Sequence, residues 1–143
     1  AMDNARSIAA RIVGAMASCG IFSVEMFVSG DDVYFSQVTP RPSRDGLVTF
    51  VTQRINQFDL QARATQRLPI DSTLISPGAV RFLEGHPSQA ALAAAMAVEE
   101  VTVRMLGDGT LVLATADSAA EARQRTDEAV REIHKIDGKP GEN

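Results

Sequence analysis

The stretch SVEMFVSGDDVYFSQVTPRPSRDG, residues 23–46, decides how the first third of the chain folds. Apolar and polar residues alternate on both sides of a Gly-Asp-Asp turn, which is the pattern of two antiparallel strands. We therefore predict a β-hairpin with arms at residues 21–29 and 33–38. Two polar residues stand out in it, because Glu25 lies in the middle of the first arm and Gln37 near the end of the second.

The pairing between the two arms depends on the length of the turn. A three-residue loop would place Phe27 opposite Phe35 and Glu25 opposite Gln37, so that an aromatic pair and a polar pair share one face. A turn of two or four residues would shift the register and separate these pairs. The sequence leaves the register open.

An ionised glutamate on a sheet needs water, a cation or a basic partner. Glu25 is an ordinary surface residue if its face is exposed to solvent, as one face of an antiparallel sheet often is. Alternatively, carboxylate and amide oxygens on adjacent strands suit Mg²⁺, which takes one or two carboxylates together with phosphate oxygens. The pattern of Glu25 and Gln37 permits both interpretations.

The segment after the hairpin carries two arginines, Arg41 and Arg44, in a loop that Pro40 and Pro42 stiffen by fixing φ. Such a loop can be a plain connection between elements. Next to a bound metal, however, preorganised guanidinium groups are suited to hold a phosphate during phosphoryl transfer.

Periodicity and turn residues predict the elements of the rest of the chain. Helices are expected at residues 3–18, 56–67 and 89–98 and after Asp117 or Ser118, and strands at 78–84, 100–106 and 110–116. Residues 47–51 have the composition of a strand. The fold class is therefore α+β.

The composition limits the possible functions. The 143 residues are 45% hydrophobic and carry a net charge of -4, which argues against a nucleic-acid partner. Cys19 is the single cysteine, so an internal disulfide is excluded. No apolar run approaches the roughly 18 residues of a membrane span. We expect a cytoplasmic protein without a membrane partner.

Residues 20–46 resemble the closing hairpin of an ATP-grasp enzyme, specifically of the formate-dependent phosphoribosylglycinamide formyltransferase family. The carboxyaminoimidazole ribonucleotide synthases are the rival family. The resemblance is carried by GIFSVEMFV, GDDVYFSQVTPRP and GLVT, and it continues more loosely through residues 58–69, 78–80 and 111–116. It implies that residues 3–68 form the C-terminal end of an ATP-grasp domain, consisting of a helix and an antiparallel hairpin. Residues 69–136 would form a small C-terminal β-rich domain with flanking helices, and residues 137–143 a disordered tail.

The resemblance also implies roles for individual residues. In that family two glutamates, one on each arm, bind the Mg²⁺ that bridges the ATP phosphates. Glu25 matches the first, but Gln37 occupies the second position, so one negative charge is lost and weaker metal binding is expected. Arg41 is implied to be catalytic and to face the phosphates. Arg44 and Asp45 fall in the substrate-binding segment, where the family pattern His-Asp-Thr-Gly is replaced by Ser-Arg-Asp-Gly.

A complete family member would use ATP to activate formate as formyl phosphate, which then formylates glycinamide ribonucleotide in purine biosynthesis. The partners implied are a nucleotide, a ribonucleotide substrate and a second copy in a homodimer. The family's ATP-binding lysines and glycine-rich flap find no match in this sequence, and its basic substrate loop is reduced to residues 107–109. We therefore expect the isolated chain to be inactive and to hold neither Mg²⁺ nor ATP. The alternative is a non-catalytic binding or assembly module derived from an ATP-grasp enzyme.

Overall fold

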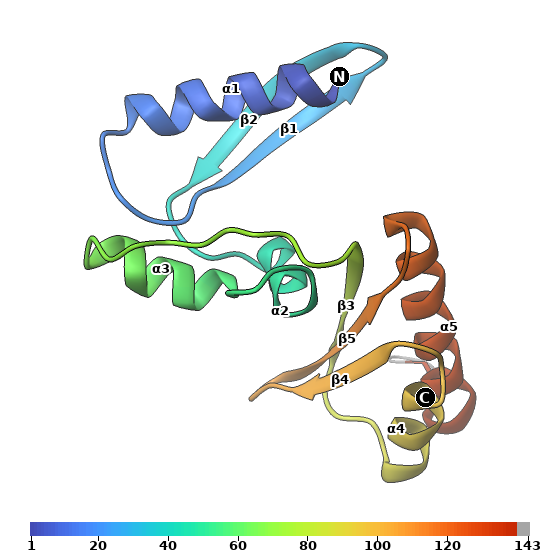
Figure 1. The fold of residues 1–143 in the computed structure, drawn as a ribbon. Coiled ribbons are helices and arrows are strands. Elements are labelled where there is room, and N and C mark those ends of the chain that lie inside the picture. The colour runs from blue at the N-terminus through green and yellow to red at the C-terminus, as the bar shows by residue number, and fades with distance from the viewer. Residues whose placement is uncertain (140–143) are drawn as a thin grey trace. The chain divides into compact units, whose positions relative to one another are not determined.

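The computed structural model describes residues 1–139, which form two compact units (Figure 1). The first unit contains residues 1–46 and 55–72, and the second contains residues 47–54 and the chain from residue 73 onward. The α+β class is confirmed. The elements of the first unit are α1 (Met2–Ala15), β1 (Ser23–Ser29), β2 (Asp32–Thr39) and α3 (Gln57–Thr65). Those that follow the hairpin into the second unit are η1 (Asp45–Val48), α2 (Thr49–Thr52), β3 (Gly78–Glu84), α4 (Gln89–Met96), β4 (Val101–Met105), β5 (Gly109–Thr115) and α5 (Ala119–Asp137).

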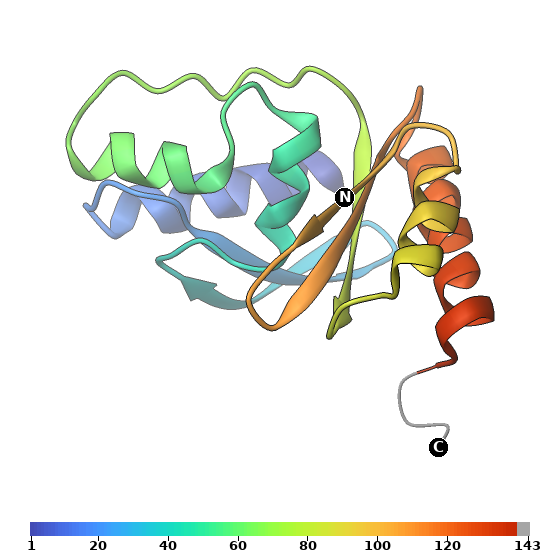
Figure 2. The ribbon, with the colours of Figure 1, turned by 90° about the horizontal axis from the view of Figure 1, so that it is seen from below.

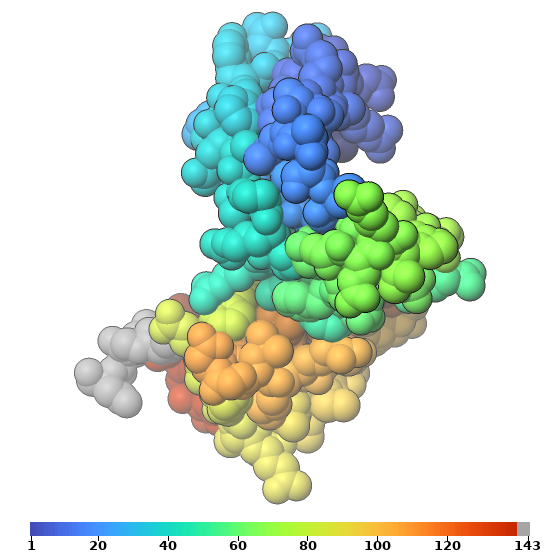
Figure 3. Space-filling model, turned by 90° about the vertical axis from the view of Figure 1, so that its left-hand side faces the viewer, coloured from blue at the N-terminus to red at the C-terminus, as the bar shows by residue number. Residues whose placement is uncertain are grey.

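Helix α1 lies along one face of the β1–β2 hairpin (Figures 1 and 3). Its apolar stripe, which includes Ile8, Ile12 and Val13, is half-buried, whereas the other side of the helix is exposed. The predicted helix is confirmed, although it begins at Met2 and ends at Ala15, with Ala1 as the N-cap residue and no side-chain cap.

The hairpin has a two-residue turn, Gly30-Asp31, because Ser29 pairs with Asp32. Phe27 therefore pairs with Tyr34, and the Phe27–Phe35 pair that a three-residue loop would give does not form. A β-bulge next to Glu25 then shifts the register by one residue, so that Glu25 pairs with Gln37 as expected. The bulge thus produces the polar pair that a three-residue loop would also have given.

Helix α3 begins at a strong cap. The side chain of Asn56 accepts hydrogen bonds from the backbone N–H groups of Phe58 and Asp59, which are free donors in the first turn of any helix. The same side chain donates to a carboxylate oxygen of Asp59 at 2.9 Å. The predicted helix is therefore confirmed, and its first residue is Gln57.

The second unit is built around a three-stranded antiparallel sheet with the order β3–β5–β4. Strand β5 is central and buried along almost its whole length. Helices α4 and α5 cover one face of the sheet (Figure 2). On this face Val112 of β5 packs against Ala95 of α4 and against Ala129 and Ile133 of α5. The small alanines allow the helices to approach the strand closely.

The other face of this sheet is covered by the segment that precedes it. Leu111 and Leu113 of β5 pack with Leu47, Phe50 and Val51. Residues 47–51, which have the composition of a strand, are instead helical in η1 and α2. Helix formation places their apolar side chains together on the sheet, so packing overrides their strand propensity.

Helices α4 and α5 are also joined by a polar contact. Ser88 caps α4 by accepting from the N–H of Ala91 at 3.2 Å. The carboxylate of Asp137, the last residue of α5, accepts from the hydroxyl of Ser88 at 2.6 Å and from its N–H at 2.7 Å. The hydroxyl bond, followed by the N–H bond, lowers the pKa of Asp137.

A disordered tail was predicted at residues 137–143, but Asp137 is the last residue of α5. The part of the predicted tail from residue 140 onward lies outside the described residues. Within residues 1–139, no helix combines the length and the apolar character that crossing a membrane requires.

The Ser88–Asp137 contact predicts a pH-dependent stability. A lowered folded-state pKa means that the carboxylate stabilises the fold above its unfolded pKa of about 4. This contribution is lost as the pH falls through the folded value. Thermal unfolding followed by circular dichroism should show Asp137→Asn to be less stable than the parent chain at pH 7, with a smaller difference at pH 3.

The matched control is Ser88→Ala, which should cost about 1 kcal/mol as a lost helix cap. In this background Asp137→Asn should have a smaller effect than in the parent chain, because the hydroxyl partner is gone and only the backbone N–H of residue 88 remains. An Asp137→Asn penalty that is equal at pH 7 and pH 3 would contradict the assignment.

Candidate functional site

The exposed face of the hairpin carries the polar pair that the sequence singled out. The side-chain N–H of Gln37 donates to one oxygen of Glu25 at 2.7 Å, and the hydroxyl of Ser36 lies 3.4 Å from the other oxygen. Both Ser36 and Gln37 reach Glu25 because a β-bulge sets two residues of one strand opposite one residue of its partner. Sequence reasoning missed Ser36, since a bulge leaves no signal in an alternating pattern.

Glu25 and Gln37 could bind a cation that takes its other ligands from a bound molecule. They do not form a site in which protein side chains supply every ligand. An ionised carboxylate can accept about four hydrogen bonds, so Glu25 keeps free positions beside Ser36 and Gln37. Among residues 1–139 there is no group of three or more His, Cys, Asp or Glu that could hold a metal. One carboxylate and one amide oxygen match Mg²⁺ that takes its remaining ligands from phosphate and water.

The three remaining predicted residues follow β2, with Arg41 and Arg44 in the loop and Asp45 at the start of η1. Arg41, Arg44 and Asp45 are all exposed. The guanidinium group of Arg41 donates to the carbonyl of Pro42 at 3.3 Å, which is a weak bond within its own loop. The structure therefore brings Glu25 and Gln37 into contact and leaves Arg41 accessible to an anion.

Gln57 anchors this loop, and sequence reasoning missed it. Its side-chain N–H donates to the carbonyl of Ser43 at 2.8 Å, and its oxygen accepts from the N–H of Ser43 at 3.2 Å. Gln57 is buried, with 3% of its surface exposed. The sequence does place Gln57 directly after the capping residue Asn56. This position predicts that Gln57 lies in the first helical turn, but it does not predict where its side chain points.

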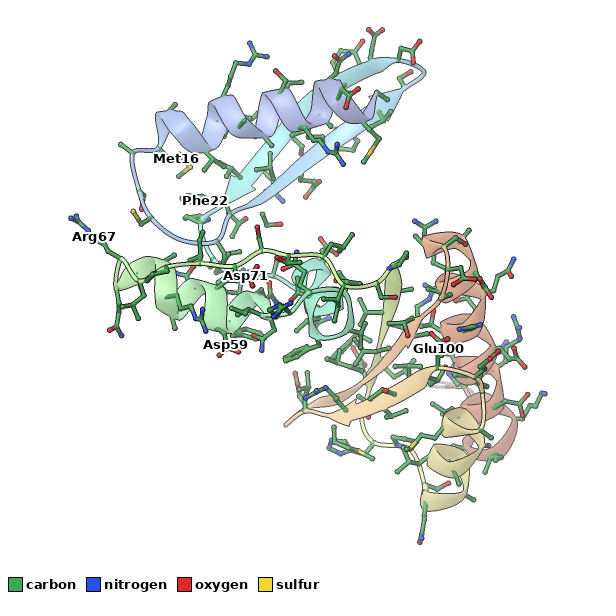
Figure 4. All side chains as sticks on the ribbon, viewed as in Figure 1. Met16, Phe22, Asp59, Arg67, Asp71 and Glu100 are labelled. Atoms are coloured by element: carbon green, nitrogen blue, oxygen red, sulfur yellow. The ribbon has the colours of Figure 1, made fainter. Side chains whose placement is uncertain are left out.

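The second unit contains a separate charged cluster around Arg125. Its guanidinium group contacts the carboxylates of Glu99, Glu100 and Glu121 at 3.0–3.3 Å. The pKa of Glu100 is lowered mainly by a hydrogen bond from Thr115. The hydrogen bond and the positive charge of Arg125 lower it further. Arg125 also donates to the carbonyl of Thr115 at 2.8 Å, so the cluster ties α5 to the end of β5. Figure 4 labels Glu100 at this position, and we assign the cluster a structural role.

Comparison with known proteins defines the class. Residues 1–58 match the model of the ATP-grasp domain. The resemblance of the hairpin to ATP-grasp enzymes is therefore confirmed, and the fold matches the C-terminal part of such enzymes.

The relatives narrow the class further. A formate-dependent phosphoribosylglycinamide formyltransferase of Corynebacterium efficiens is 48% identical over 138 residues, which cover 87% of this chain and 34% of the relative. A protein of the same name from Paraburkholderia xenovorans is 37% identical, with 97% of this chain and 38% of the relative covered. The chain thus spans about a third of the length of these curated relatives.

Solved structures agree with this relationship. The structure of glycinamide-RNase-transformylase T from Mycobacterium tuberculosis superposes with a TM-score of 0.85 at 43% identity, covering 92% of this chain and 41% of that one. N5-carboxyaminoimidazole ribonucleotide synthetase from Thermotoga maritima gives a TM-score of 0.81 at 25% identity, covering 90% and 40%. The family that the sequence resembles and its rival both share this fold.

Gly46 offers a test of the anchored loop. A Cβ at this position would lie 1.9 Å from the side-chain oxygen of Gln57. The Gly46→Ala variant must therefore displace Gln57 and strain both of its bonds to Ser43, each contributing about 1 kcal/mol. We expect Gly46→Ala to lower the free energy of unfolding by about 1–3 kcal/mol, the usual range for overpacking.

Gly14 provides the matched control, since it lies inside α1 and a Cβ there meets nothing within 4 Å. Gly14→Ala should raise the stability by about 0.5–1 kcal/mol through helix propensity. Urea denaturation followed by circular dichroism measures both variants. Equal effects of the two substitutions would mean that Gln57 does not hold the loop.

Proposed function

We propose that this chain supplies the metal-facing hairpin and the phosphate-facing loop of an ATP- and Mg²⁺-dependent formyltransferase that acts on glycinamide ribonucleotide. The observation that carries the proposal is the contact of Glu25 and Gln37 on an exposed sheet face, followed directly by a loop with two exposed arginines. The names of the relatives support formate and phosphoribosylglycinamide as substrates. Because the chain spans about a third of those relatives, it would act only as part of a complete site.

Each residue has a defined task in this proposal. Bound Mg²⁺ would neutralise charge on the phosphates of ATP, which is its usual contribution to phosphoryl transfer. Glu25 would provide the single negative ligand, and Gln37 would occupy the second ligand position, where it can offer a neutral amide oxygen. Arg41 binds phosphate oxygens, since its planar fork matches their geometry. Arg44 and Asp45 contact the ribonucleotide.

The partners and the location follow from the same proposal. A nucleotide and a ribonucleotide would bind at the completed site, and a second copy would form a homodimer. The protein would act in the cytoplasm, without nucleic-acid or membrane partners. By itself the chain should be inactive and bind neither Mg²⁺ nor ATP.

A second candidate is a non-catalytic binding or assembly module. The Gln37–Glu25 hydrogen bond favours it, because this bond satisfies the carboxylate without a cation. Arg44 also replaces the family's acidic substrate contact. The two candidates differ in one respect. The first predicts that the site catalyses formylation when the rest of an ATP-grasp enzyme is present, and the second predicts that it does not.

A chimera tests the choice between them. This chain would replace the matching part of the Corynebacterium efficiens formyltransferase, and ATP- and formate-dependent formylation of glycinamide ribonucleotide would be measured. We expect slow turnover with a weak dependence on Mg²⁺. Gln37→Glu should tighten the apparent Mg²⁺ affinity on the order of tenfold, because it restores a second carboxylate to the site.

Glu25→Gln is the matched control and should abolish turnover, since no negative ligand remains at the metal position. A folded chimera that binds Mg-ATP but stays inactive with Gln37→Glu would favour the module. Turnover that is unchanged by Glu25→Gln would contradict the metal assignment.

A further inference from the structure

Helix α3 carries two glutamines four residues apart, Gln57 and Gln61. Residues with this spacing lie above one another on the same face of a helix. The Asn56 cap fixes the first residue of α3 and therefore the direction of this face. Asp59 projects from the opposite side of the helix, as Figure 4 shows.

The two glutamines bind the chain on either side of the hairpin. Gln57 pairs with both backbone groups of Ser43, which lies four residues beyond the end of β2. The side-chain oxygen of Gln61 accepts from the N–H of Ile21 at 2.6 Å, two residues before β1 begins. A Cβ at Gly20 would approach the same oxygen to 3.0 Å, so the chain passes close to Gln61.

These contacts lie where the strand ladder no longer holds the chain. The last paired residues at the open end of the hairpin are Ser23 and Thr39, and all three hydrogen bonds to α3 fall outside them. Figure 4 shows Phe22 at this open end, on the side of α3. One helix therefore holds the incoming and the outgoing segment of the hairpin together.

We propose that Gln57 and Gln61 are positioning residues that fix the Arg41–Arg44 loop relative to Glu25. Glu25 is held by the ladder of the sheet, whereas the loop leaves the sheet after Thr39 and needs a separate anchor. Gln57 supplies this anchor, and Gln61 keeps α3 in place at the neighbouring strand. The placement of the arginines as phosphate ligands rests on the proposed function, but the two-point attachment does not.

The two glutamines use their amide groups differently, and this difference gives a sharp test. Gln61 acts only as an acceptor toward Ile21, a task that a glutamate performs equally well. Gln57 both donates and accepts at Ser43, and a glutamate has no N–H to donate. The substitution Gln→Glu should therefore preserve the attachment at residue 61 and break it at residue 57.

The experiment follows backbone amide exchange in the whole 143-residue chain by NMR. In Gln61→Met the amide of Ile21 should exchange about tenfold faster, as expected for the loss of one hydrogen bond, and Gln61→Glu should restore the parent rate. In Gln57→Met the amide of Ser43 should show the same acceleration, and Gln57→Glu should not restore it. The exchange of amides paired within the β1–β2 ladder, such as that of Phe27, reports whether the hairpin stays folded.

A functional readout separates positioning from general stability. In the Corynebacterium efficiens chimera, Gln57→Met should raise the KM for ATP several-fold while kcat changes less, because the arginine loop is mispositioned and Glu25 is not. Unchanged exchange at Ser43 and Ile21 in the Met variants would overturn the attachment, and unchanged KM in an active chimera would overturn the positioning role. A chimera that never turns over counts against the proposed function, and the attachment is then decided by the exchange rates alone.

Discussion

A single extra residue, Ser36, determines which side chains face each other across the hairpin. The two-residue turn alone would pair Glu25 with Ser36 and place Gln37 on the same face as Val24. The bulge moves Gln37 to the face of Glu25 and returns Val38 to the half-buried face that α1 covers. The polar site and the apolar contact with α1 therefore depend on the same irregularity.

The first unit depends on such specific contacts because its apolar core is small. Among residues 1–46 and 55–72, all of which the structure describes, only Gln57 and Leu60 are buried. Two-stranded hairpins are marginal without further packing, and Phe27 and Tyr34 on the outer face remain 63% and 56% exposed. A buried glutamine with both amide ends paired then contributes a large share of the order in this unit. The second unit differs, since its central strand is buried on both faces.

The sequence predicted the elements well wherever one local signal controlled them. Alternation located the strands, and Asn56 and Ser118 capped helices at the expected places. It failed where distant packing decides the outcome, as for Leu47, whose segment is helical because its apolar side chains cover β5. The pairing of Glu25 with Gln37 was among the registers that the sequence left open, and it arises from a bulge and not from a three-residue loop. The residues that hold the site, Ser36 and Gln57, were missed because their roles arise from a register shift and from a helix far along the chain.

In the proposed site, Gln37 in place of the glutamate that the resemblance implies would change more than the charge. Two facing glutamates repel each other, so a cation that binds between them also relieves this repulsion. Glu25 and Gln37 instead stabilise each other through a 2.7 Å hydrogen bond, and the N–H that donates it points toward the carboxylate. Ligation of a cation by both side chains requires the amide to turn its oxygen inward, which sacrifices that bond. In the proposed metal site, both the lost charge and the broken hydrogen bond would therefore lower the affinity for Mg²⁺. If the proposed site binds Mg²⁺, one carboxylate is its only negative protein ligand here, so the binding would depend largely on the phosphates that arrive with the metal.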